Sequence, residues 1–101
     1  MTICNITMKV SWHIHNEWIH WMRSEYIPYV MKSGSYEKYQ WCRLTEVDET
    51  DGPTYCVQYF LPEKIPSDQL PAEDVAIQLG KVVARWGSDC LAFRTIMNVV
   101  H

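Results

Sequence analysis

The chain has 101 residues, of which 48% are hydrophobic and 21% charged, with a formal net charge of −3 at pH 7. This length predicts one domain over residues 1–101, and the composition excludes disordered and fibrous classes. The nine lysines and arginines are scattered, which argues against nucleic acid or an anionic membrane surface as a partner. No apolar run is long enough to span a bilayer, and the N-terminus does not resemble a signal peptide. We therefore expect a soluble cytoplasmic protein.

The first predicted element is a strand over residues 2–10. Cys4, Ile6, Met8 and Val10 fall on one face, because successive side chains of a strand point to opposite sides. The other face is mostly polar, so one side of this strand should contact the core.

A long helical pattern follows, from His13 to Gly34. Its apolar arc begins with Ile14, Trp18, Trp21 and Met22, spaced i, i+4, i+7 and i+8; Ser33-Gly34 is a typical helix stop. Pro28 lacks a backbone donor and disfavours α conformation at Ile27, so the helix should end or kink near Tyr26.

The remaining chain predicts three strands and one helix. The aromatic and β-branched segments flank a turn that contains Asp51-Gly52-Pro53, which favours a β-hairpin. The second helix is amphipathic, with apolar positions spaced i, i+4, i+7, i+8 and i+11. In chain order we expect strand Tyr36–Val47, turn Asp48–Pro53, strand Thr54–Leu61, loop Pro62–Pro71, helix Ala72–Trp86 and strand Cys90–Val100. The apolar positions of the helix are Val75, Leu79, Val82, Val83 and Trp86.

The order β-α-β-β-α-β predicts an α+β, ferredoxin-like fold, with a four-stranded antiparallel sheet and two helices on one face. The strands carry more large apolar side chains than one face can hold: Tyr36, Tyr39, Trp41, Tyr55, Tyr59, Phe60, Phe93 and Ile96. The face without helices should therefore expose an apolar patch, mixed with Asn5, Lys9 and either Arg94 or Thr95. Two such faces could pair, which predicts a homodimer; the alternative is an aromatic but solvated surface.

The four cysteines, Cys4, Cys42, Cys56 and Cys90, contain no C-x-x-C pair, so they indicate neither a zinc ribbon nor a thioredoxin-type motif. They are spread one to each predicted strand or strand edge. We interpret them as small buried hydrophobic residues and not as disulfide or reactive groups.

One histidine-rich face of the first helix is a candidate metal site. His13, Glu17 and His20 are spaced i, i+4 and i+7, and imidazole and carboxylate groups are ligands for zinc or iron. This face lies opposite the apolar arc, where such spacing is ordinary for solvent-exposed pairs. We therefore predict no metal and no cofactor. Haem would require His20 or another histidine in the cleft, which the helical wheel opposes.

Candidate ligand-binding residues lie where this helix faces the sheet. In a regular helix Glu25 would be central in the apolar arc, and a carboxylate there would suit a general acid or base. Alternatively, distortion at Pro28 lets Glu25 reach water. Arg43 and Arg94 could join tyrosines at this cleft or pair with acidic residues across strands. The tentative ligand-binding set is Trp18, Met22, Glu25, Tyr26, Tyr59 and Arg94.

Three separated motifs resemble a family of short, uncharacterised bacterial proteins. The first is Glu17-Trp18-Ile19-His20-Trp21-Met22, followed by Ile27-Pro28 and Ser33-Gly34. The others are Thr54-Tyr55-Cys56-Val57-Gln58-Tyr59-Phe60, and Phe93-Arg94-Thr95-Ile96-Met97 after Trp86-Gly87. The similarity covers essentially the whole chain. One departure is Tyr26, where relatives often have a histidine before Ile-Pro, so no role of that histidine carries over.

The resemblance implies a ferredoxin-like fold of the dimeric α+β barrel type, a superfamily that includes antibiotic-biosynthesis monooxygenases. Two hypotheses follow. The chain is either a dimeric protein of unknown function that binds at most a small ligand in the helix–sheet cleft, or a cofactor-independent monooxygenase or isomerase. The enzyme predicts a closed pocket lined by Glu25, Tyr26 and an arginine; the binding protein predicts that these groups are exposed or that the cleft is filled. The sequence does not decide whether the chain is an enzyme.

Overall fold

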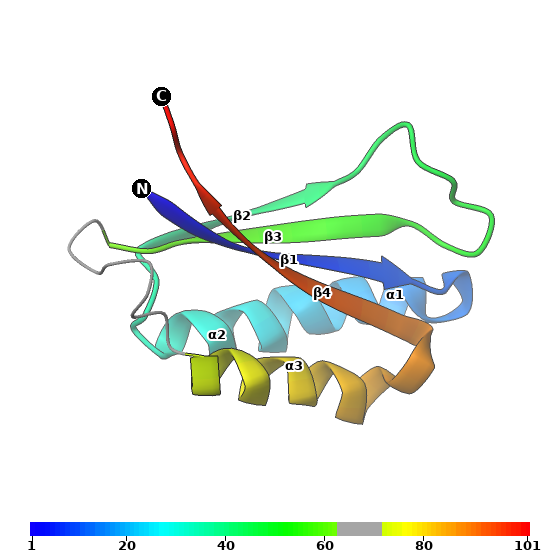
Figure 1. Cartoon of the computed structure of the whole chain (residues 1–101). Coiled ribbons are helices and arrows are strands. Elements are labelled where there is room, and N and C mark those ends of the chain that lie inside the picture. Colours follow the sequence, from blue (N-terminus) through cyan, green and yellow to red (C-terminus); the bar gives the residue numbers. More distant parts are fainter. Residues whose placement is uncertain (63–71) are drawn as a thin grey trace.

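A computed structural model of the chain describes residues 1–62 and 72–101, and it shows an antiparallel sheet with helices against one face (Figure 1). The strand order is β2-β3-β1-β4. The elements are β1 (Thr2–Val10), a 3-10 turn (Trp12–Ile14), α1 (His15–Trp21), a π-helical segment (Met22–Tyr26), α2 (Ile27–Lys32), β2 (Lys38–Arg43), β3 (Thr54–Phe60), α3 (Ala72–Trp86), a second 3-10 turn (Gly87–Asp89) and β4 (Cys90–Asn98). The predicted α+β class and β-α-β-β-α-β order are confirmed.

Three strands are shorter than predicted, and of these β3 ends at Phe60, one residue before the predicted boundary. β2 ends at Arg43 and does not reach Val47. Glu46 adopts a left-handed backbone conformation with φ 58°, which a continuing strand cannot accommodate. β4 ends at Asn98, two residues before the predicted boundary. The loop predicted over Pro62–Pro71 lies, from residue 63 on, outside the described residues.

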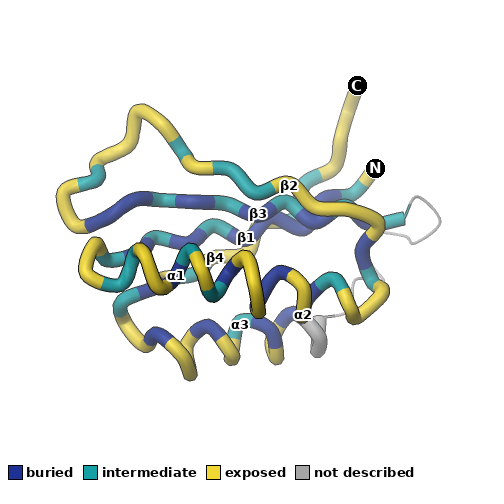
Figure 2. The backbone as a smooth tube through the Cα atoms, turned by 180° about the vertical axis from the view of Figure 1, so that it is seen from behind, coloured by how far each residue is buried: buried dark blue, intermediate teal, exposed yellow. Residues whose placement is uncertain are grey.

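The core lies between the sheet and the helices, where the inward residues of each strand meet the first helix and α3 (Figure 2). In β1 the predicted inward residues, Cys4, Ile6, Met8 and Val10, are all at most 5% exposed. Alternate residues of β3, Tyr55, Val57 and Tyr59, are buried on the same side. The period-two pattern of these strands therefore orients them correctly.

The first helix runs through Pro28 and does not end before it. Its middle turn is π-helical, and the backbone N–H of Ile27 donates to the carbonyl of Met22, five residues earlier. Proline cannot donate a hydrogen bond, and its ring clashes with the carbonyl four residues before it in a regular helix. A wider turn immediately before Pro28 relieves this conflict, so α2 begins at Ile27 on the same overall course.

α3 has the predicted bounds, but its buried stripe is narrower than the set of apolar positions predicted from the sequence. Val75, Val82 and Trp86 are buried as predicted, and Gln78 joins them at 7% exposed. The prediction was wrong for Val83, which is 62% exposed. Val83 follows Val82 by one residue, which places it about 100° further around the helix and outside the contact with the sheet.

The hairpin loop between β2 and β3 is held by backbone hydrogen bonds to the end of β1 and the residues after it. The N–H of Val10 donates to the carbonyl of Pro53 at 3.0 Å, and the N–H of Trp12 donates to that of Asp51 at 3.2 Å. Gly52 lies between these bonds with φ 156°, and a Cβ added to it would be 1.6 Å from the Val10 carbonyl oxygen. Only glycine lets the two backbones approach this closely.

Candidate functional site

Glu25, a candidate acid–base group, lies on the solvent side of the first helix. The π-helical segment contains one more residue per turn than a regular helix, so the side chains after Met22 are rotated around the axis. Glu25 is exposed as a result, while Tyr26 and Ile27 are only 3% and 2% exposed. This is the outcome expected if Pro28 distorts the helix.

The other predicted residues of the first helix and β3 belong to one packed cluster. Trp18, Met22, Tyr26 and Tyr59 are each at most 3% exposed and are members of the same core. The Trp18 ring lies 4.9 Å from that of Tyr55 and 5.9 Å from that of Trp41. The structure therefore places these four in the packed core, and their predicted role in binding a ligand stays a prediction.

The two buried phenols remain protonated at neutral pH. Burial, and secondarily neighbouring thiol and phenol groups, raises the pKa of Tyr26 and of Tyr59 above the usual value for tyrosine. Tyr26 donates its hydroxyl hydrogen to the backbone carbonyl of Gln78 at 2.9 Å, which links the first helix to α3. Neither phenol can supply a phenolate base.

Arg43 and Arg94 do not gather at one site. Both lie on the helix-facing side of the sheet, but Arg43 is on the edge strand β2 and Arg94 is on β4, the opposite edge. Arg43 forms an ion pair with Glu49 at 2.8 Å. Arg94 is exposed. The structure thus places the two arginines at opposite edges of the sheet, and a role of Arg94 in binding a ligand stays a prediction.

A polar and aromatic cluster at the start of the first helix was not predicted. The Nε2 atom of His15 lies 2.8 Å from the hydroxyl oxygen of Tyr55, and the indole N–H of Trp12 donates to the carbonyl of Glu49 at 2.8 Å. Burial, and secondarily the Arg43 guanidinium, lowers the pKa of His15. These contacts join the helix to the β2–β3 loop. They join residues that are 37 and 40 positions apart, so no local pattern signals them.

The metal hypothesis concerned the exposed face of the first helix. His13, Glu17 and His20 all point to solvent, and His13 Nε2 lies 3.2 Å from a carboxylate oxygen of Asp89. Among residues 1–62 and 72–101, no group of three or more histidine, cysteine, aspartate and glutamate side chains is placed to hold a metal ion.

Glu25 instead borders a groove on the outer surface, where the first helix meets α3. The groove, of about 410 Å³, is lined by Asn16, Glu17, His20, Trp21, Glu25 and Arg85. Trp21 stacks on Tyr26 with ring centroids 4.8 Å apart. The Arg85 guanidinium lies 3.9 Å from the Trp86 ring centroid and 3.9 Å from a Glu17 oxygen. We call this hollow the interhelical groove; it combines an aromatic wall with charges of both signs.

The sheet face opposite the helices, the open face, is organised in rows that cross the strands. The pairing register places side chains directly opposite one another from β2 through β3 and β1 to β4. Phe93 and Leu91 are 60% and 49% exposed on this face. The rows are Lys38–Phe60–Ile3–Met97 (the Phe60 row), Gln40–Gln58–Asn5–Thr95 (the amide row), Cys42–Cys56–Thr7–Phe93 (the thiol row) and Thr54–Lys9–Leu91.

Sequence comparison places the chain in a family. The family described as "Domain of unknown function (DUF4286)" matches residues 1–100. The chain belongs to this family. A comparison of this DUF4286 chain with curated proteins found no match. In the part of the DUF4286 domain that the structure describes, no helix has the length and apolar character needed to cross a membrane.

Proposed function

We propose that the chain functions as a homodimer, with the open faces of two sheets packed against each other. The face exposes large apolar side chains, Leu91 and Phe93. Among the described strand residues, it carries two charged groups, Lys9 and Lys38, toward opposite ends of the strands. An exposed apolar patch with few charges is typical of an interface.

The amide row is the observation that favours a second copy of this chain as the partner. Glutamine and asparagine side chains carry both hydrogen-bond donors and acceptors, so such a row can pair with itself. A two-fold axis along the amide row would place each amide row on its copy. It would also oppose the Phe60 row of one protomer to the thiol row of the other, which places Phe93 against Met97 of the partner subunit.

The size of the open face suits a small, reversible interface. Four strands about 4.8 Å apart and about seven residues long, at about 3.3 Å per residue, cover roughly 19 by 23 Å. Two such faces give a flat area of about 900 Å², and side-chain relief increases the accessible surface. Specific interfaces bury about 1,200–2,000 Å². We therefore expect dimers that dissociate on dilution.

Two exposed apolar residues provide a matched test. Phe93 is 60% exposed on the open face, and Val83 is 62% exposed on α3, outside the proposed interface. Phe93→Glu would replace an apolar side chain of the interface with a charge whose burial is costly. Light scattering after gel filtration should give twice the 11.9 kDa chain mass for the wild type and for Val83→Glu, and the chain mass for Phe93→Glu. A dimeric Phe93→Glu variant with an unchanged circular dichroism spectrum would overturn this interface.

A second candidate function is binding of a small ligand in the interhelical groove. Trp21 and the charges of Glu25 and Arg85 suit a molecule that has an apolar ring and carries both charge signs. Free tryptophan is a suitable probe. Its titration should shift the amide NMR signals of residues 16–25 and 85, and the shifts should weaken in Arg85→Gln. Shifts confined to the rest of the chain would reject the groove.

The alternative, a cofactor-independent monooxygenase or isomerase, receives less support. Such chemistry needs a general base in a site from which water is excluded. Glu25 is exposed, and the raised pKa values keep Tyr26 and Tyr59 protonated. Four cysteines without a disulfide suit the reducing cytoplasm, which we propose as the location.

A further inference from the structure

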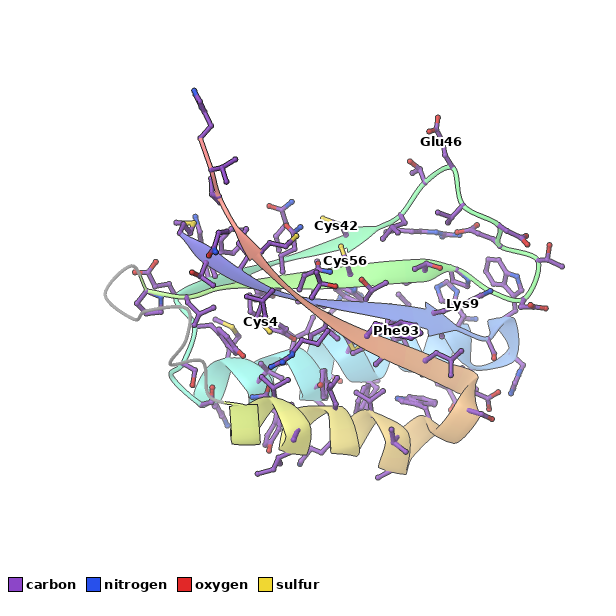
Figure 3. All side chains as sticks on the ribbon, viewed as in Figure 1. Cys4, Lys9, Cys42, Glu46, Cys56 and Phe93 are labelled. Atoms are coloured by element: carbon purple, nitrogen blue, oxygen red, sulfur yellow. The ribbon has the colours of Figure 1, made fainter. Side chains whose placement is uncertain are left out.

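Two of the four cysteines face each other across neighbouring strands. Cys42 of β2 and Cys56 of β3 are register partners on the open face, and Figure 3 shows their side chains on the side away from the helices. Leu44, two residues beyond Cys42, donates its N–H to the carbonyl of Thr54 at 2.9 Å. Because hydrogen-bonded pairs alternate along an antiparallel ladder, Cys42 and Cys56 also form such a pair.

The spacing of such a pair suits a disulfide bond. Hydrogen-bonded pairs in antiparallel sheets have Cα atoms about 5.5 Å apart, and disulfides are found at Cα separations of about 4.4–6.8 Å. Opposite Cβ atoms are about 4.5–5.5 Å apart, whereas a disulfide requires about 3.8 Å. Because a hydrogen-bonded pair lies at the wide end of this range, closing the bond brings the two Cβ atoms closer by about 1.7 Å. The strain makes the product easily reduced.

The surroundings of the two thiols differ from those of the other cysteines. Cys4 and Cys90 are buried in the core, where burial raises the pKa of Cys90 to about 11. Cys42 and Cys56 are partly exposed. The side-chain amide of Gln40 donates to the Cys42 sulfur at 3.3 Å. Burial, and secondarily the adjacent Cys42, raises the pKa of Cys56. Cys42 is therefore the better nucleophile.

We propose that Cys42 and Cys56 form an oxidation site that a hydroperoxide converts reversibly into a cross-strand disulfide. The Cys42 thiolate attacks the terminal peroxide oxygen; an S–O bond forms, the O–O bond breaks, and the departing oxygen takes a proton to leave as water or an alcohol. The Cys56 sulfur then attacks the Cys42 sulfenic acid; the S–S bond forms, the S–O bond breaks, and water leaves with the thiol proton. Two thiols are oxidised and one peroxide is reduced.

The test uses the reduced full-length chain, dilute, treated with hydrogen peroxide. Thiol titration under denaturing conditions should fall from four to two per chain. The intact mass should fall by two hydrogen atoms, and peptide mapping should link Cys42 to Cys56. Dithiothreitol should restore all thiols. Cys56→Ser should stop at a sulfenic acid on Cys42 that dimedone traps, whereas Cys42→Ser should form neither product.

The wild-type measurement is independent of whether these variants fold. Retention of all four thiols, under conditions that fully oxidise free cysteine, would overturn the proposal. So would a disulfide that involves Cys4 or Cys90, or a bond between chains. Repeating the oxidation in Phe93→Glu separates this proposal from the dimer, because the pair should still close in a chain that cannot pair its sheets.

Discussion

The π-helical segment makes a prediction about two residues that lie two positions apart. Measured from Trp18, a regular helix would place Glu25 within about 20° of the same direction and Ile27 on the opposite side. The structure reverses this, since Glu25 is exposed and Ile27 is 2% exposed. Alanine substitutions at the two positions therefore test the helix geometry and the position of the proposed acid–base group together.

Ile27→Ala should destabilise the fold strongly, while Glu25→Ala should not. Removing three buried carbon atoms, at about 0.8 kcal/mol each, accounts for about 2.4 kcal/mol. The residual cavity adds to this, within the range of about 2–5 kcal/mol for such changes. A surface change usually stays within about 0.5 kcal/mol. For a domain of this size, we expect a melting temperature lower by about 10 °C or more in Ile27→Ala.

Urea unfolding of both variants, followed by tryptophan fluorescence, gives the two free energies. The slope of the free energy of unfolding against urea concentration should equal that of the wild type if each variant unfolds in two states. The reasoning is refuted if Glu25→Ala loses more than about 1.5 kcal/mol while Ile27→Ala stays near the wild type, because a regular helix with Glu25 in the core produces that order.

Two further predictions concern a glycine and a histidine. Gly52→Ala should lower the free energy of unfolding by about 2 kcal/mol or more, because its Cβ would meet the Val10 carbonyl oxygen at 1.6 Å. Gly80→Ala, which meets no atom within 4 Å in α3, should raise it by about 0.5–1 kcal/mol; equal effects in urea unfolding would contradict this. Because the folded pKa of His15 lies below its ordinary 6.5, the unfolded chain takes up this proton first as the pH falls. The contribution of neutral His15 to the free energy of unfolding is therefore complete above pH 6.5 and is lost as the pH falls through the folded pKa. His15→Gln should flatten this decline in the free energy of unfolding, and His20→Gln should not.

The strand pattern and the capping signals predicted most of the fold. β1 and α3 have the predicted bounds, because strict alternation and a helical stripe each select one buried face. The turn at Asp51-Gly52-Pro53 correctly separates β2 from β3. These features depend on neighbours along the chain, and such neighbours are visible in a sequence.

The candidate site depended on information that the sequence does not contain. Pro28 predicts a distortion, but not that the helix absorbs it as a π-helical turn and rotates Glu25 outward. The pairing of Cys42 with Cys56 depends on the strand register, which a shift by one residue would change. The sequence also left open which of Arg94 and Thr95 lies on the open face. Pairing of Arg94 with the buried Ile6 shows that it is Thr95.

Sedimentation equilibrium of the wild-type chain over a wide concentration range tests the homodimer most directly. The open-face interface predicts a mass of twice 11.9 kDa at high concentration, falling toward 11.9 kDa on dilution. A single species of 11.9 kDa at every concentration would contradict the proposal, and the open face would then be a solvated surface.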